Sequence, residues 1–101
     1  MTKQPLVSII IPYFKKKKYF KKTIHSIFSQ SYKNFEIILI YDDIDQTELK
    51  FVKDTLKIIK KKKILINKKN LGPGISRNKG VLKSKGSFVA FCDADDIWNK
   101  D

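Results

Sequence analysis

Short apolar runs alternate along this chain with segments whose apolar residues follow a helical spacing. Four runs have the length and composition of buried strands, and they occupy residues 6–11, 35–41, 64–66 and 88–92. The first run stops at Pro12, which lacks a backbone N–H and is therefore expected just outside the ladder. The last run, Phe88 to Cys92, is expected to be a strand buried on both faces.

Between the runs, apolar residues recur every third or fourth position, which predicts three amphipathic helices. Their apolar positions are Phe20, Ile24, Ile27 and Phe28 in the first, Leu49, Val52, Leu56 and Ile59 in the second, and Ile75, Val81 and Leu82 in the third. Pro73 suits the start of the third helix, Gly80 weakens it by about 1 kcal/mol relative to alanine, and Gly86 is placed as its end.

The resulting order, β-α-β-α-β-α-β, predicts a single α/β domain over residues 1–101. Right-handed crossovers place helices on both faces of a mostly parallel sheet, so the expected architecture has three layers, α/β/α. In sheets of this kind, ligands bind outside the carboxyl ends of the strands. Residues that directly follow the predicted strands are therefore the first candidates for a functional site.

The chain carries 22 basic and 10 acidic residues, which gives a formal net charge of +12. Such an excess attracts nucleotides, nucleic acid and anionic lipid. Only Arg77 is an arginine, and the dominance of lysine argues against specific base reading, which favours the guanidinium fork. A basic nucleic-acid-binding module is kept as the non-enzymatic alternative, and attraction to a membrane surface through the lysines is left open.

The single cysteine, Cys92, excludes an internal disulfide and fits a reducing compartment. The N-terminal residues lack the pattern of a signal peptide, and no apolar run approaches the roughly 20 residues of a membrane span. We therefore expect a cytoplasmic protein, with peripheral attachment to the inner face of the membrane as a variant of this location.

Three carboxylates follow the fourth predicted strand within four positions, at Asp93, Asp95 and Asp96. Like charges this close are costly unless a cation or hydrogen-bond donors hold them. Mg²⁺ and Mn²⁺ prefer oxygen ligands, and Mg²⁺ often takes one or two carboxylates together with substrate phosphates. The alternative is that one of the three caps a following helix and the others are solvated.

Three further segments are expected at the same rim of the sheet: residues 12–15, the acidic pair 42–43, and residues 72–77. An aromatic side chain such as Phe14 can stack on a base, and a carboxylate can accept hydrogen bonds from a base or a ribose. A helix start beside Arg77 can hold an anion. Together these groups describe a site for a metal–nucleotide diphosphate. The alternatives are Phe14 in the core, an acid of the pair capping the second helix, and Arg77 on the surface.

Four segments of the chain resemble, in the right order, the family 2 glycosyltransferases, which have the GT-A fold. The first three read VSIIIP at 7–12, SIFSQSYKNFEI at 26–37 and NLGPGISRNKG at 70–80. The fourth, DADDIW at 93–98, is similar to the DxD motif of the family. The match covers nearly the whole chain and is therefore far more specific than any one segment. It implies the Rossmann-like, nucleotide-sugar-binding N-terminal half of an inverting transferase.

Carried over to this sequence, the resemblance implies a nucleotide site formed by Pro12, Phe14, Asp43, Arg77 and Asp93. Phe14 corresponds to the aromatic residue that contacts the base in the family. Asp43 corresponds to the position that usually meets uracil, and Arg77 to a residue near the phosphates or the donor sugar.

The resemblance also implies a metal site for Mn²⁺ or Mg²⁺. Asp95 looks like the direct metal ligand, with Asp93 near the ribose or the metal and Asp96 as an accessory. The chain departs from the family pattern where Phe14 lacks the hydroxyl of a tyrosine, Lys15 replaces an asparagine and Ile44 replaces a glycine. The change at Ile44 puts the shape of that turn in doubt.

The reaction implied is transfer of a sugar from a nucleotide diphosphate, with UDP as the expected nucleotide, to the hydroxyl of a glycan or lipid-linked acceptor with inversion. The metal neutralises the departing diphosphate, and a carboxylate base deprotonates the acceptor. In the family this base lies well downstream of the DxD motif, so it is expected beyond Asp101 and no residue here is assigned as catalytic. We therefore expect a donor-binding half that is inactive alone and whose uncovered sheet edge favours self-association.

Two other classes of small α/β domain fit less well. A response-regulator receiver domain has its acidic pair after the first strand, whereas here the pair follows the second. A dinucleotide-binding domain has its glycine motif directly after the first strand, where this chain has residues 12–15.

Overall fold

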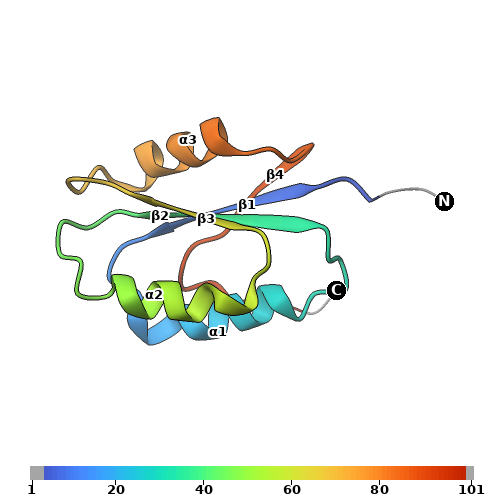
Figure 1. The fold of residues 1–101 in the computed structure, drawn as a ribbon, viewed down its shortest axis with the longest axis horizontal. Helices are drawn as coiled ribbons and strands as arrows, with labels where there is room; N and C mark the ends of the chain where they lie inside the picture. Colours follow the sequence, from blue (N-terminus) through green and yellow to red (C-terminus); the bar gives the residue numbers. More distant parts are fainter. Residues whose placement is uncertain (1–3, 100–101) are drawn as a thin grey trace.

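The computed structural model describes residues 4–99, and within them strands and helices alternate as the sequence predicts. The elements are β1 (Val7–Tyr13), α1 (Lys17–Phe28), β2 (Phe35–Tyr41), α2 (Leu49–Thr55), the 3-10 helix η1 (Leu56–Ile58), β3 (Lys62–Ile66), α3 (Pro73–Lys83) and β4 (Phe88–Phe91). Figure 1 follows them from blue at the N-terminus to red at the C-terminus.

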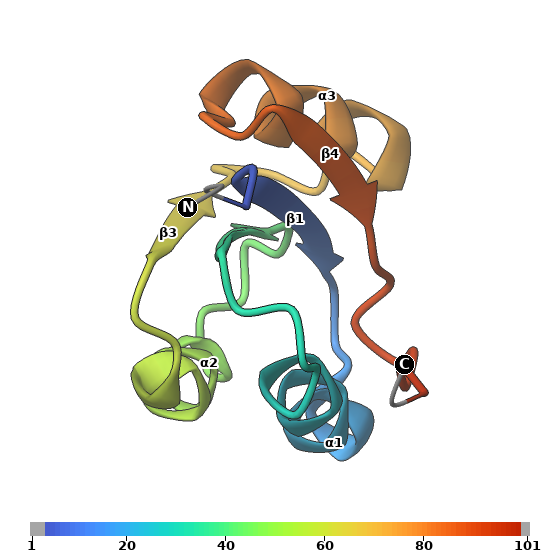
Figure 2. The ribbon, with the colours of Figure 1, turned by 90° about the vertical axis from the view of Figure 1, so that its right-hand side faces the viewer.

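The four strands form one parallel sheet in the order β3-β2-β1-β4. Helices α1 and α2 lie side by side on one face of this sheet, below it in Figures 1 and 2, and α3 lies on the other face. The predicted three-layer α/β class is confirmed. All four carboxyl ends of the strands point to the same rim because every strand runs in the same direction.

The core lies between the sheet and the α1–α2 layer. Strands β1 and β2 are buried along nearly their whole length because each has a neighbour on both sides. Phe20, Ile24 and Ile27 of α1 pack into this core with Val52 of α2 and Leu56 of η1, as their spacing predicts. Full burial of one such side chain contributes about 1.5–3 kcal/mol, so this layer supplies most of the apolar stabilisation.

Pro12 lies inside β1, opposite Ile40 of β2, so the expectation that it stands outside the ladder is wrong. Alternate residues of a strand direct their backbone groups to opposite neighbours. Ile10 faces β4, because its carbonyl accepts the N–H of Cys92 at 3.0 Å. Pro12 faces the same side two residues later, where pairing with β4 has already ended. The missing N–H of the proline therefore leaves no ladder bond unmade.

Strand β4 is an edge strand with largely exposed side chains, so the expectation that it is buried on both faces is wrong. Phe88 and Phe91 are 61% and 53% exposed. In the described part of the chain β4 pairs with β1 alone, and α3 packs over β1 and β2 instead. Cys92, directly after the strand, is buried as predicted. An apolar run does not reveal whether its strand has neighbours on one side or on two.

Helix α3 meets the sheet through Ser76 and Gly80. The apolar stripe predicted for this helix is wrong, because its members are exposed: Ile75, Val81 and Leu82. A Cβ atom at position 80 would lie 2.5 Å from Cγ2 of Ile10, so only glycine lets the helix approach the sheet this closely. The close packing offsets the helix weakening expected for this glycine.

Two smaller expectations also differ from the structure. Phe28 is half-exposed at the end of α1 instead of completing its buried face. Helix α3 ends at Lys83, three residues before Gly86. Gly86 instead donates its N–H to Oγ of Ser8 at 2.8 Å, and a Cβ there would lie 2.6 Å from the same oxygen. This glycine allows the loop before β4 to pass close to β1.

Candidate functional site

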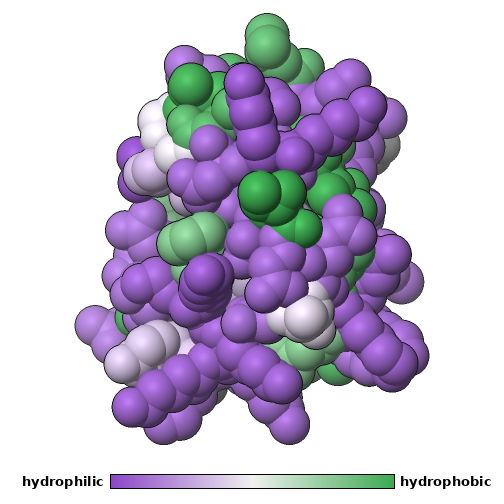
Figure 3. Space-filling model, turned by 90° about the vertical axis from the view of Figure 1, so that its left-hand side faces the viewer, coloured by the Kyte–Doolittle hydropathy of each residue, from purple (hydrophilic) through white to green (hydrophobic). Residues whose placement is uncertain are grey.

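A pocket of about 360 Å³ opens at the carboxyl ends of β1 and β4, beside the first turns of α3. Five residues predicted for the nucleotide or metal site line it: Pro12, Phe14, Arg77, Asp93 and Asp95. Figure 3 views the molecule from this end of the sheet, where most of the surface is hydrophilic. The fold therefore gathers at one place most of the residues that the strand-end rule selected.

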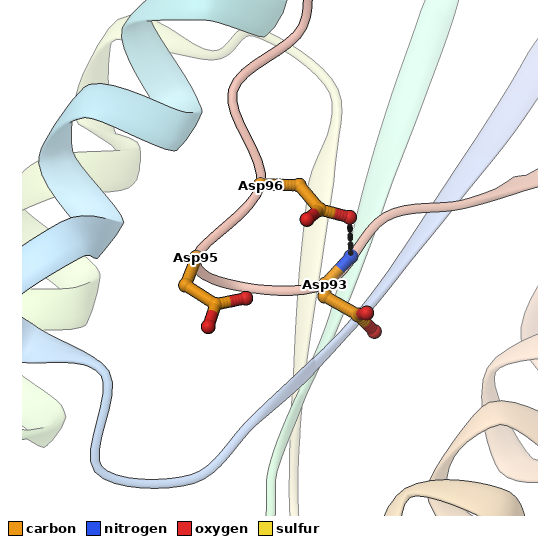
Figure 4. A group of neighbouring side chains, drawn as sticks. All are labelled: Asp93, Asp95 and Asp96. Carbon is orange, nitrogen blue, oxygen red and sulfur yellow. Dashed lines mark hydrogen bonds between the residues drawn. The ribbon is translucent and has the colours of Figure 1, made fainter.

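Asp93, Asp95 and Asp96 form an exposed acidic turn directly after β4 (Figure 4). One carboxylate oxygen of each lies within 4.8 Å of the other two. The N–H of Asp96 donates to the carbonyl of Asp93 at 3.0 Å, and the N–H of Asp93 donates to the carboxylate of Asp96 at 3.3 Å. These bonds hold Asp96 against the turn, whereas Asp93 and Asp95 line the pocket.

Two cations from other elements pair with this acidic turn. The guanidinium of Arg77 lies 3.1 Å from Oδ1 of Asp93, and Nζ of Lys16 lies 3.3 Å from Oδ2 of Asp95. Both pairs are partly exposed, where an ion pair contributes about 0–1 kcal/mol. A divalent ion or a phosphate can therefore replace either partner at little cost. Lys16 was missed by sequence reasoning, because the run of lysines from 15 to 18 does not show which of them turns toward the acids.

The donor atoms of this turn fit a hard divalent cation. They are carboxylate oxygens, which Mg²⁺ and Mn²⁺ prefer. The buried Cys92 is not part of this cluster, and burial and then the negative charges of Asp96 and Asp93 raise the pKa of its thiol to about 12.

Asp42 is buried at the same rim but has a different environment. Its carboxylate accepts the backbone N–H groups of Leu71 at 2.7 Å and Gly72 at 2.9 Å. It also accepts the side-chain amides of Asn67 at 2.9 Å and Asn70 at 3.2 Å. Gly72 is the residue before α3 and has φ +87°, a conformation that favours glycine. Asp42 therefore holds the loop that sets the start of α3 and, through it, the position of Arg77.

Asp43 is buried and accepts the N–H of Asp45 at 3.0 Å. It does not line the pocket, so its contact with the base stays a prediction. The alternative in which Asp42 or Asp43 caps the second helix is wrong, because Glu48 occupies the N-cap position of α2.

The loop after β1 presents Phe14 to the pocket with 43% of its surface exposed, so the alternative of a core position is excluded. Its neighbour Tyr13 is the core residue: the ring stacks on Tyr41, and the hydroxyl donates to Glu48 at 2.5 Å. Burial and then this bond raise the pKa of Tyr13. Lys15 has φ +52°, which asparagine adopts more readily than lysine. The loop thus keeps a backbone shape suited to asparagine even though the residue is lysine.

The sequence of this chain matches a known family over almost its full length. Residues 8–101 match the family model described as Glycosyl transferase family 2. The chain belongs to this family. A curated relative from Escherichia coli, the UDP-Glc:alpha-D-GlcNAc-diphosphoundecaprenol beta-1,3-glucosyltransferase WfgD, is 35% identical over 94 residues, which are 92% of this chain and 36% of that protein.

Solved structures share the fold of this chain. TarS of S. aureus, as residues 1–349 in complex with UDP, has a TM-score of 0.83 and 32% identity over 94% of this chain and 29% of that one. The mannosyltransferase PcManGT from Pyrobaculum calidifontis, in complex with GDP-Man and Mn²⁺, has a TM-score of 0.86 over 96% of this chain and 29% of that one. At 18% identity, the second likeness shows the fold alone.

The chain spans only part of its relatives. It covers 39% of the length of one curated relative, 37% of a second and 13% of a third. Within residues 4–99, none of the helices combines the length and the apolar character that crossing a membrane requires.

Proposed function

We propose that this chain binds the nucleotide part of a UDP-sugar together with Mn²⁺ or Mg²⁺, as the donor site of an inverting glycosyltransferase that builds a polysaccharide or another glycan. One observation carries the proposal. A single pocket contains an exposed aromatic ring, a guanidinium and two neighbouring carboxylates, contributed by Phe14, Arg77, Asp93 and Asp95. A base, a diphosphate and a divalent cation require these three kinds of group.

The acidic turn is the proposed metal site. Asp95 is the assigned ligand, Asp93 contributes to the metal or the ribose, and Asp96 supports the turn. A bound metal would neutralise the negative charge of the departing diphosphate. The pocket residues themselves orient the donor: Arg77 pairs with phosphate oxygens in place of Asp93, and its planar fork suits such a bidentate contact.

The nucleoside end of the donor is assigned to the loops after β1 and β2. Phe14 offers an exposed ring face for the base, beside Pro12 in the same pocket wall. Asp43 is assigned to the uracil, where its carboxylate would accept an N–H of the base. Its bond from Asp45 uses Oδ1, so Oδ2 is the oxygen assigned to this contact.

Calorimetric titration of UDP with and without Mn²⁺ tests the metal-dependent donor site. Wild-type protein should bind UDP at least tenfold more tightly with Mn²⁺, and Asp95→Asn should lose this gain. Asp54→Asn is the matched control, because Asp54 is an exposed aspartate of α2 that pairs with Lys50 and Lys57 away from the pocket. UDP affinity that depends on neither Mn²⁺ nor Asp95 would contradict the site assignment. Parallel titrations with GDP and TDP measure the base preference.

We expect the 101 residues to bind the donor without transferring its sugar, because they span 39% or less of the length of four curated relatives. Release of UDP from UDP-glucose measures transfer and hydrolysis together. Turnover by these residues that rises with added acceptor would contradict this part of the proposal. The lone buried Cys92 fits a reducing compartment, and we propose the cytoplasm as the location.

A further inference from the structure

The outer side of the α1–α2 layer carries two hollows that the donor site does not use. The first, of about 580 Å³, lies between α1 and α2 and is lined by Lys17, Lys18, Lys21, Lys22, His25 and Phe51. The second, of about 290 Å³, lies between the end of α1 and η1, and its lining includes Phe28, Lys33, Ile58, Lys60 and Lys61. Among the described residues, no acidic side chain lines either hollow. We call this lysine-lined surface the seam.

The lining of the seam carries one sign of charge, and Asp54, an acid of α2, is paired with two lysines that do not line the hollows. Asp54 of α2 lies 3.0 Å from Nζ of Lys50 and 3.2 Å from Nζ of Lys57. Within residues 4–99 no lysine of the seam forms a salt bridge, so the charges of these lysines can attract an anionic partner. Their side chains are long and flexible, so they can reach several phosphate groups on an extended surface without a fixed geometry.

A lysine ammonium lies near each of two aromatic rings of the seam. Nζ of Lys17 lies 5.3 Å from the ring of Phe51, and Nζ of Lys33 lies 5.5 Å from the ring of Phe28. Phe51 also packs edge-on against Phe20 of the core, at 6.4 Å between ring centroids. Phe51, which lies between Lys17 and Phe20 and is only partly exposed, is a poor stacking platform for a base of a single-stranded nucleic acid, whereas Phe28 is half-exposed. Phe51 in the first hollow and Phe28 and Ile58 in the second lie among these lysines, and lysine clusters of this kind are attracted to anionic lipid headgroups.

We infer that the seam docks this protein on the anionic surface of a membrane, with the lysines of α1 on lipid phosphates. The arrangement places the docking surface next to the donor pocket, since Lys16 lines the pocket and α1 begins at Lys17. Docking through α1 therefore holds the mouth of the pocket near the bilayer. This inference goes beyond the donor site and stands on different residues, so either can fail without the other.

Co-sedimentation with lipid vesicles tests the inference. The protein should bind vesicles of phosphatidylglycerol and phosphatidylcholine at least tenfold more tightly than vesicles of phosphatidylcholine alone. Lys21→Glu combined with Lys22→Glu should reduce this binding at least tenfold. The matched control is Lys68→Glu with Lys69→Glu, which changes the net charge equally at two exposed lysines of the loop between β3 and α3. The control should lose less than threefold.

Two outcomes would overturn the inference. One is an equal loss of vesicle binding in the two double variants, which would mean that total charge and not the seam attracts the lipid. The other is tighter binding of a single-stranded oligonucleotide than of the anionic vesicles, lost in the Lys21→Glu, Lys22→Glu variant. Thermal unfolding and UDP titration of each variant report separately whether the fold and the donor site are intact.

Discussion

Two groups of aspartates meet at the same rim of the sheet, one after β2 and one after β4. In the first group, Asp42 is 3% exposed and its carboxylate takes four hydrogen bonds from the loop before α3. In the second group, Asp93, Asp95 and Asp96 are exposed, and one carboxylate oxygen of each lies within 4.8 Å of the other two. The residues are chemically identical, so the difference between the groups comes from the donors that surround them.

The buried aspartate at the rim therefore has a structural role, whereas the exposed aspartates are available to bind a ligand. A carboxylate whose lone pairs are used by the protein has no capacity left for a metal or a substrate. A carboxylate held only by exposed ion pairs can exchange its partner for a metal ion or let that partner move to a phosphate. Asp42 fixes the structure of the pocket, and the acidic turn after β4 is the part of the pocket whose carboxylates are available to a ligand.

Asp42→Ala should have the largest effect on the fold. Removing this buried carboxylate leaves the N–H groups of Leu71 and Gly72 without their acceptor and takes one acceptor from each of two side-chain amides, which costs about 3 kcal/mol or more. Urea unfolding followed by circular dichroism measures the loss. Asp54→Ala serves as the control and should leave the unfolding midpoint unchanged, because its ion pairs are exposed. An Asp42→Ala protein within about 0.5 kcal/mol of wild type would show that Asp42 does not hold the loop.

Mn²⁺ should stabilise the wild-type fold through the acidic turn and should not stabilise Asp95→Asn. Binding to the folded state alone contributes about 1.4 kcal/mol when the free ion is at tenfold its dissociation constant. Thermal unfolding across a series of Mn²⁺ concentrations measures this gain without any nucleotide. Asp42→Asn should keep the gain if it folds, since Asp42 is assigned no metal. Equal stabilisation of wild type and Asp95→Asn would place the ion elsewhere.

Glu36 extends the comparison to the opposite end of the sheet, where a third acid is buried. Burial would raise its pKa, but bonds from the Ser8 hydroxyl at 2.6 Å and the Lys85 N–H at 2.8 Å outweigh this and lower the pKa of Glu36 below its ordinary value of 4.5. A lowered folded-state pKa means that the stabilisation is complete above about pH 4.5 and is lost as the pH falls through the folded-state value.

Glu36→Gln should therefore remove part of the acid sensitivity of the fold and cost about 1 kcal/mol at neutral pH. Urea unfolding between pH 3 and pH 7 measures both effects. The curves of wild type and variant should converge as the pH falls. Parallel curves would show that Glu36 does not titrate between the two states.

Lys16→Met should have the smallest effect and should change two affinities in opposite directions. Without the ammonium beside Asp95, Mn²⁺ alone should bind about two- to fivefold more tightly, since an exposed ion pair of about 0–1 kcal/mol no longer competes. UDP with Mn²⁺ should bind more weakly, because a positive charge at the pocket is lost. Calorimetry gives both values. The control Lys18→Met, on the outer side of α1, should change neither affinity. If Lys16→Met shifted both affinities in the same direction, Lys16 would not be the partner that Mn²⁺ displaces from Asp95.

Much of the fold was predictable because it depends on local spacing. Phe20, Ile24 and Ile27 point the same way on any helix, so their burial follows from the sequence. Parallel strands joined by helices place their ends on one rim, so the meeting of Phe14, Arg77 and Asp95 also follows. The exposure of β4 and the packing of α3 through Gly80 could not be predicted, because they depend on which elements become neighbours.

The sequence by itself determined the order of the elements, the family and the residues that follow each strand. Only the tertiary structure decided what each of those residues does. The bonds that occupy Asp42 come from residues 25 to 30 positions further along the chain, and Lys16 reaches Asp95 across 79 positions. Spacing along a chain fixes the direction of a side chain within its own element. The partners that fill its hydrogen bonds or balance its charge are supplied by other elements, and these meet only when the sheet forms.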